Sequence, residues 1–167
     1  MKRIIFALLF SISLASSLAD ADSGPPIGSE SRDASLAFVV TINATVSQIG
    51  AQCLSLLDRP ESAAQYSENW RNNNAEIVGA AAIYMNARMN EAFEFGGEAL
   101  KTRTMNALLG TANQQSSATT REWLEGDDKV RRCEHALQAI DQGVLDLNDN
   151  VPMYNELLAL VDWATKQ

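Results

Sequence analysis

Apolar residues recur every three or four positions along most of the chain, which is the pattern of amphipathic α-helices. The first segment covers residues 34–57, with a stripe of Val39, Ile42, Val46, Ile49, Cys53 and Leu57. Pro60 ends it, because proline cannot donate the next helical hydrogen bond. We predict a second helix from residue 61 up to the glycine-containing stretch 93–97. Its seam consists of Ala63, Tyr66, Trp70, Asn73, Ile77, Ala80, Tyr84 and Ala87. Asn73 is the polar exception: it is either buried to set the helix register, or turned to solvent with its neighbouring asparagines.

Three further helices complete the pattern. Residues 98–116 form a weaker segment, since Gly110 and several Thr and Asn residues lower its helix propensity. Residues 128–142 form a cleaner one that begins at an aspartate cap and stops at Gly143. The last helix follows Asp149 and Asn150, with Pro152 in its first turn. Period-two alternation is not sustained anywhere. We therefore predict an all-α fold, an antiparallel four-helix bundle with an additional C-terminal helix.

The N-terminal residues have the composition of an export signal. Lys2 and Arg3 precede an apolar run at residues 4–14, and small residues lead up to Ala19. The run is shorter than the roughly 20 residues that span a bilayer. We expect a signal peptide over residues 1–19, a disordered polar leader over 20–33, and a single helical domain over 34–167. The mature protein is then periplasmic or secreted, without membrane insertion.

The net charge is −8 over the whole sequence. Loss of Lys2 and Arg3 with the signal leaves 11 basic against 21 acidic residues, a net charge of −10. A domain of this charge repels nucleic acid and anionic lipid. It attracts a basic protein, or simply gains solubility. We therefore expect no nucleic-acid partner. The sequence does not indicate the oligomeric state.

The two cysteines decide whether the chain offers reactive chemistry. Cys133 precedes His135, the only histidine, by two positions. On a helix such residues point about 200° apart, so they cannot share a metal or a substrate. Cys53 and Cys133 both lie on core-facing stripes, at helix ends that share one pole of an up-down bundle. We predict a structural disulfide between them, and no metal, cofactor or catalytic residue.

What remains for function is the surface. Phe93 and Phe95 flank Glu94 before two glycines, where they either present aromatic rings to a partner or plug the open end of the bundle. Several acidic residues of the C-terminal third have few balancing cations and form the candidate partner-binding set. They are Asp141, Asp146, Asp149, Glu156 and Asp162.

Three function classes fit these features. The first is an exported, non-catalytic protein-binding module, such as an immunity protein or an enzyme inhibitor, that occludes a basic partner. The second is a carrier of a small apolar ligand between helices, with walls from residues 80–82 and from Met85, Met89 and Met105. The third is a wall-degrading enzyme that uses Glu122 beside Trp123 as an acid.

Overall fold

The computed structural model describes residues 27–167, so the predicted signal peptide and residues 20–26 of the predicted leader lie outside the described residues. The described part contains five α-helices and no strand, which confirms the all-α bundle. The helices are α1 (Glu30–Cys53), α2 (Ala63–Asn73), α3 (Ala75–Leu124), α4 (Lys129–Asp141) and α5 (Tyr154–Ala164).

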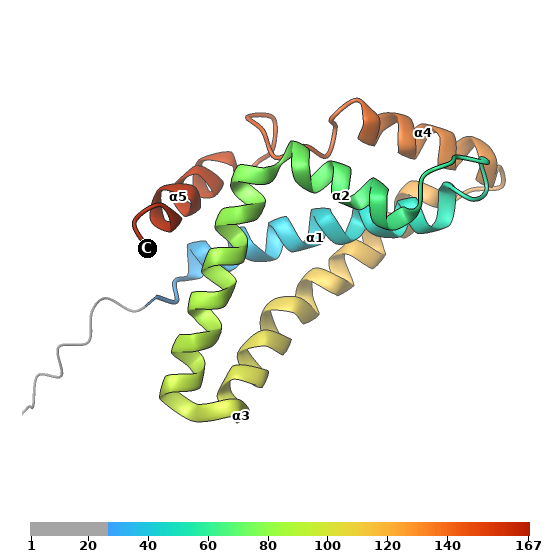
Figure 1. Cartoon of the computed structure of the whole chain (residues 1–167). Helices are drawn as coiled ribbons and strands as arrows, with labels where there is room; N and C mark the ends of the chain where they lie inside the picture. The colour runs from blue at the N-terminus through green and yellow to red at the C-terminus, as the bar shows by residue number, and fades with distance from the viewer. Residues whose placement is uncertain (1–26) are drawn as a thin grey trace, which may run out of the picture.

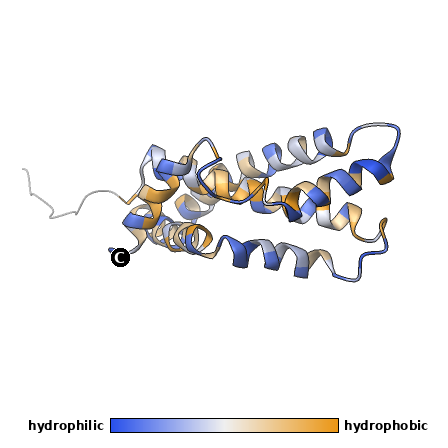
Figure 2. Cartoon of the chain, turned by 90° about the horizontal axis from the view of Figure 1, so that it is seen from above, coloured by the Kyte–Doolittle hydropathy of each residue, from blue (hydrophilic) through white to orange (hydrophobic). Residues whose placement is uncertain are grey.

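Helix α1 is the centre of the bundle and contacts each of the other four helices (Figure 1). Its buried side chains follow the predicted stripe and include Val39, Val46, Ile49 and Cys53. Hydrophobic residues lie where the helices meet, whereas the ends of the outer helices are mostly hydrophilic (Figure 2). By length and composition alone α1 could cross a membrane, but 44 % of its most apolar window is buried inside the bundle.

Helix α1 begins earlier and ends earlier than its sequence pattern predicts. It starts at Glu30 instead of residue 34, so the prediction of a disordered leader is wrong for residues 30–33. The Ser29 side chain caps this end by accepting a hydrogen bond from the backbone N–H of Arg32. The other end is at Cys53, and turns with a positive φ at Asp58 lead to α2.

The predicted second helix is in fact two helices. A capping box formed by Ser62 and Gln65 starts α2, as the residue types suggest. The helix stops at Asn74, whose φ of −112° and ψ of 25° are not helical. Asn73 is exposed and Asn74 is buried, so the neighbouring asparagine takes the interior position. The apolar stripe resumes in α3 with the buried Ile77, Ala80 and Tyr84, and both α2 and α3 pack against α1.

Helix α3 is bent into two arms at Gly96 and Gly97. Gly97 has φ 61° and ψ −160°, a conformation that only glycine adopts at low cost. The bend agrees with the predicted break in this stretch. The second arm runs on to Leu124, eight residues beyond the predicted end at residue 116, and therefore includes Trp123. The two arms form a V whose elbow projects from the body of the molecule (Figure 1).

Cys53 and Cys133 form the predicted disulfide, with their Cα atoms 5.1 Å apart and both residues fully buried. The bond joins the last residue of α1 to the second turn of α4, because these two ends lie at the same pole of the bundle. It closes a loop with a sequence separation of 80 that contains α2 and all of α3. His135 is exposed on α4, on the wet side that the helical geometry predicts.

Candidate functional site

A polar groove with a volume of about 220 Å³ lies between α2 and the end of α4. Helix α2 contributes Tyr66 and Trp70, α4 contributes Asp141, and the loop after α4 contributes Asp146. Arg59, Glu61, Asn69, Asn73 and Ile140 complete the lining. The groove therefore combines three carboxylates with aromatic and amide side chains. With Arg59 included, its lining residues have a net charge of −2.

Tyr66 connects α2 to α4 at the floor of this groove. Its hydroxyl donates to Asp141 Oδ1 at 2.9 Å, and the Leu137 carbonyl oxygen lies at 3.4 Å. Burial of the ring, followed by the hydrogen bond to Asp141, raises the pKa of Tyr66 above its ordinary value. The phenol therefore stays protonated near neutral pH and acts as a donor that orients Asp141. A general base must be deprotonated to accept a proton, and the raised pKa of Tyr66 disfavours that form.

Arg59 lies at the mouth of the groove between two of the carboxylates. Its Nε donates to Glu61 Oε1 at 2.9 Å, and its Nη1 lies 3.4 Å from Asp141 Oδ2. The hydrogen bond with Glu61 raises the pKa of Arg59 and lowers the pKa of Glu61. A guanidinium group is thus already accommodated by the carboxylates of this groove. The side chain of Arg59 is 38 % exposed, so water screens these ion pairs.

Asn74 holds the loop that follows α4 against the junction of α2 and α3. Its Nδ2 donates to the Trp70 carbonyl at 2.8 Å and to Asp146 Oδ1 at 3.2 Å, and its Oδ1 accepts from the backbone N–H of Leu147 at 2.6 Å. The indole N–H of Trp70 donates to the Leu145 carbonyl at 3.1 Å. These bonds fix Asp146 beside α2 and explain why the helix breaks at Asn74: its side chain satisfies backbone groups of a distant loop.

The structure brings together only part of the predicted partner-binding set. Asp141 and Asp146 line the groove, but Asp149 lies in the loop before α5, and Glu156 and Asp162 lie on α5. Asp162 is also paired with Lys166. The α2 residues of the groove are missing from the prediction because they are about 70 positions away from Asp141 in the sequence.

Phe93 and Phe95 lie at the elbow of α3, on the side of the molecule opposite α2 and α4 (Figure 1). They are 52 % and 76 % exposed. The alternative in which they plug the end of the bundle is therefore wrong. A single surface that combines these rings with the acidic residues is not formed either, because neither phenylalanine lines the groove and the elbow lies away from α2 and α4.

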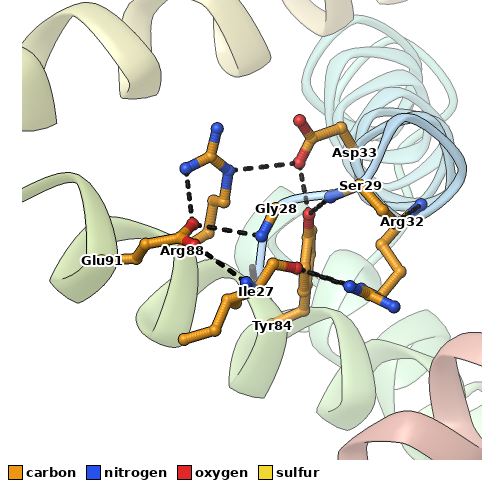
Figure 3. Close-up of polar contacts among 8 residues, drawn as sticks. All are labelled: Ile27, Gly28, Ser29, Arg32, Asp33, Tyr84, Arg88 and Glu91. Carbon is orange, nitrogen blue, oxygen red and sulfur yellow. Dashed lines mark hydrogen bonds and ion pairs between the residues drawn. The ribbon is translucent and has the colours of Figure 1, made fainter. Parts of the chain in front are cut away.

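A second polar cluster ties the start of the described chain to α3 (Figure 3). Glu91, almost fully buried, accepts hydrogen bonds from the backbone N–H groups of Ile27 at 2.8 Å and Gly28 at 3.1 Å. Its carboxylate also lies 2.7 Å from Arg88 Nη1, and Arg88 Nε lies 3.7 Å from Asp33. Arg88 Nε forms no hydrogen bond within the described residues, but the carboxylate of Glu91 is fully used by its three donors. We therefore interpret the cluster as an anchor for the start of α1.

Tyr84 and Arg32 extend the anchor towards α5. The Tyr84 hydroxyl donates to Asp33 and accepts from the backbone N–H of Ser29. Burial, and then the bond to Asp33, raises the pKa of Tyr84 to about 12. The guanidinium of Arg32 donates to the Ile27 carbonyl and lies 5.3 Å from the Trp163 ring centroid. The first turn of α1 is therefore fixed to α3 and to the last helix at once.

The residues predicted for a wall-degrading enzyme and for an apolar-ligand carrier do not form the expected sites. Glu122 is exposed and Trp123 is only half-buried, so this carboxylate is not enclosed by the aromatic ring. An apolar hollow of about 200 Å³ lies between α1 and the first arm of α3, and Ala81, Ala82 and Met85 are among its walls. Met89 and Met105 do not line it. Among residues 27–167, no three His, Cys, Asp or Glu side chains form a group that could hold a metal ion.

Comparisons with protein-family models, curated proteins and solved structures find no match to this chain.

Proposed function

We propose that the protein is an exported, non-catalytic binding module that receives a cationic side chain of a protein partner in the groove between α2 and α4. The export signal predicted over residues 1–19 and the disulfide, which persists in oxidising compartments, support a periplasmic or secreted location. In its most concrete form the protein is an immunity protein or an inhibitor that occludes a basic cleft of an enzyme.

The observation that carries the proposal is the convergence of Glu61, Asp141 and Asp146 around one groove that already accommodates a guanidinium, that of Arg59. Asp146 has no cation paired with it in the described part of the chain. A partner's arginine or lysine would meet this carboxylate first and then those of Glu61 and Asp141, while the buried Tyr66 and Trp70 form the floor beneath them. The overall negative charge would speed the encounter with a basic surface.

The test compares two pairs of charge-neutralising substitutions. Asp141→Asn with Asp146→Asn changes the groove and keeps the oxygen atoms that accept from Tyr66 and Asn74. Asp149→Asn with Glu156→Gln removes the same charge elsewhere on the surface. Each immobilised protein is used to capture proteins from the exported fraction of the source cells. We expect the wild type and the Asp149/Glu156 double variant to capture the same basic partner, and the Asp141/Asp146 double variant to lose it. Binding of that partner should weaken with added salt.

Equal loss in both pairs would mean that only net charge matters, and would contradict a specific groove. Capture that is insensitive to salt and to the groove pair would also contradict it. Either result would mean that the partner does not bind at the groove between α2 and α4.

One specific observation supports the alternative function of a carrier, namely the apolar hollow between α1 and α3. Its volume is smaller than the roughly 300–1,000 Å³ of most ligand pockets, and it lies at the surface. The substitution Ala82→Leu would fill it without changing charge. Binding of an apolar fluorescent dye that is lost in this variant would favour a carrier, and dye binding that is absent or unchanged would count against one.

A further inference from the structure

A second polar groove lies where α1, the end of α3 and the start of α4 meet, with a volume of about 470 Å³. Gln48 and Gln52 come from α1, Thr120 and Arg121 from α3, and Glu125 and Lys129 from the α3–α4 connection and the first residue of α4. It shares no lining residue with the groove between α2 and α4. What it binds is therefore independent of the proposed function.

Cations without a partner gather at this groove. Arg121 and Lys129 line it, and within residues 27–167 neither side chain forms an ion pair or a hydrogen bond. The guanidinium of Arg132 lies against Gly126: a Cβ atom there would be 3.0 Å from its Nε. Arg132 is likewise unpaired in this part of the chain, whereas Arg131, one residue earlier, pairs with Asp128. In a strongly acidic protein, two unpaired cations in one groove, with a third next to its Gly126, indicate a site for negative charge.

Thr120 adds an independent observation. The residue is only 3 % exposed and lines the groove, yet its hydroxyl has no hydrogen-bond partner. Buried hydroxyl groups are nearly always hydrogen-bonded, so this hydroxyl is an unsatisfied polar group in the wall of the groove. Gln48 donates to Ser116 at 3.1 Å, and the exposed Gln52 has its amide available beside it.

We propose that this groove binds a ligand through a carboxylate group. Arg121 offers the planar pair of donors that a carboxylate accepts, and Lys129 adds a second charge. Thr120 and Gln52 then form hydrogen bonds with the polar atoms of the ligand next to its carboxylate, and Leu124 provides an apolar wall. Glu125 also lines the groove, so its lining residues, which do not include Arg132, have a net charge of +1. This charge suits a singly charged carboxylate better than a doubly charged phosphate. The ligand is either a free organic acid or the C-terminus of a peptide.

The test is a calorimetric titration of the full protein with N-acetyl-leucine, and with the corresponding neutral amide as the matched probe. We expect saturable binding of the acid only. Arg121→Gln should weaken it at least tenfold, and Lys129→Gln should also weaken it. Arg131→Gln, which removes a cation of the same helix outside the groove, should leave the affinity unchanged. A folded Thr120→Val variant should bind more weakly, because it lacks the hydroxyl but keeps the shape.

Absence of binding, equal binding of the acid and the amide, or equal weakening by Arg131→Gln would overturn the proposal. A tripeptide with a free C-terminus separates the two sources. Tighter binding of the tripeptide than of N-acetyl-leucine supports a peptide terminus, and equal binding supports a small acid.

Discussion

Replacing Glu91 by glutamine tests how strongly the start of α1 is anchored. The carboxylate of Glu91 accepts from Ile27 and Gly28 at 2.8 and 3.1 Å and lies 2.7 Å from Arg88 Nη1. A hydrogen bond to a charged group contributes about 1.5–3 kcal/mol, and bonds that share one acceptor group do not add fully. Glutamine keeps one acceptor oxygen but turns an N–H₂ group towards donors. We expect unfolding to become easier by about 2–3 kcal/mol.

For a domain of this size the change corresponds to a fall of roughly 5–10 °C in Tm. Thermal and urea unfolding followed by circular dichroism measure it. Amide exchange should show that residues 27–33 open more often, while α4 near the disulfide keeps its protection. Glu94→Gln is the matched control, because Glu94 lies one turn further along α3, is exposed, and makes no ion pair or hydrogen bond in the described part of the chain.

The control should stay within about 0.5 kcal/mol of the wild type. If Glu91→Gln were equally mild, the buried carboxylate would not stabilise the fold and the interpretation of this cluster as an anchor would be refuted. A chain that begins at Ser29 gives a second check. In that shorter chain Glu91→Gln should lower the free energy of unfolding by less, because the backbone N–H groups of Ile27 and Gly28 are absent.

Removal of the disulfide by Cys53→Ser with Cys133→Ser should lower the free energy of unfolding by about 4–5 kcal/mol in the loop-entropy model; equilibrium urea unfolding measures this, and a loss below about 1 kcal/mol would contradict a stabilising crosslink. Gly97→Ala should destabilise by about 1–3 kcal/mol through its backbone conformation alone, since an added Cβ meets no atom within 4 Å. Gly110→Ala, within regular helix and equally unhindered, should instead stabilise slightly, and similar effects of both changes on Tm would argue against the bend. The pKa of Tyr84 is raised in the folded state to about 12, above its unfolded value of about 10. Its contribution to stability is therefore complete below the unfolded value and is lost as the pH rises through the folded one. The difference in unfolding free energy between the wild type and Tyr84→Phe should shrink over this range, and a constant difference would exclude the linkage.

The disulfide and the helical fold follow from local pattern, because an apolar stripe with a three-to-four spacing marks the core face wherever it occurs. Cys53 and Cys133 both lie on such stripes, and helix direction places them at one pole. The break at Asn74 is different. That residue leaves the helix because its side chain bonds Leu147 and Asp146, a loop more than 70 positions away. A spacing rule contains no information about that loop.

The sequence does not predict the early start of α1, for a similar reason. Its first turn is polar and resembles a linker, and what orders it is Glu91 and Tyr84 on α3. The candidate groove shares this property. Asp141 was identifiable as a surface acid, whereas its pairing with Tyr66 and Arg59 depends on how α2 packs against α4. Long-range side-chain bonds decide each of these features.

The bond between the sulfurs also determines how the molecule would carry mechanical load. A pull on the two ends of the folded domain would pass along α1, cross to α4 at the crosslink, and leave through α5. Helix α2 and both arms of α3 lie within the loop that the disulfide closes, so they would bear no pulling force until that bond breaks. Stretching in an optical trap should therefore extend the oxidised protein far less than its full contour length.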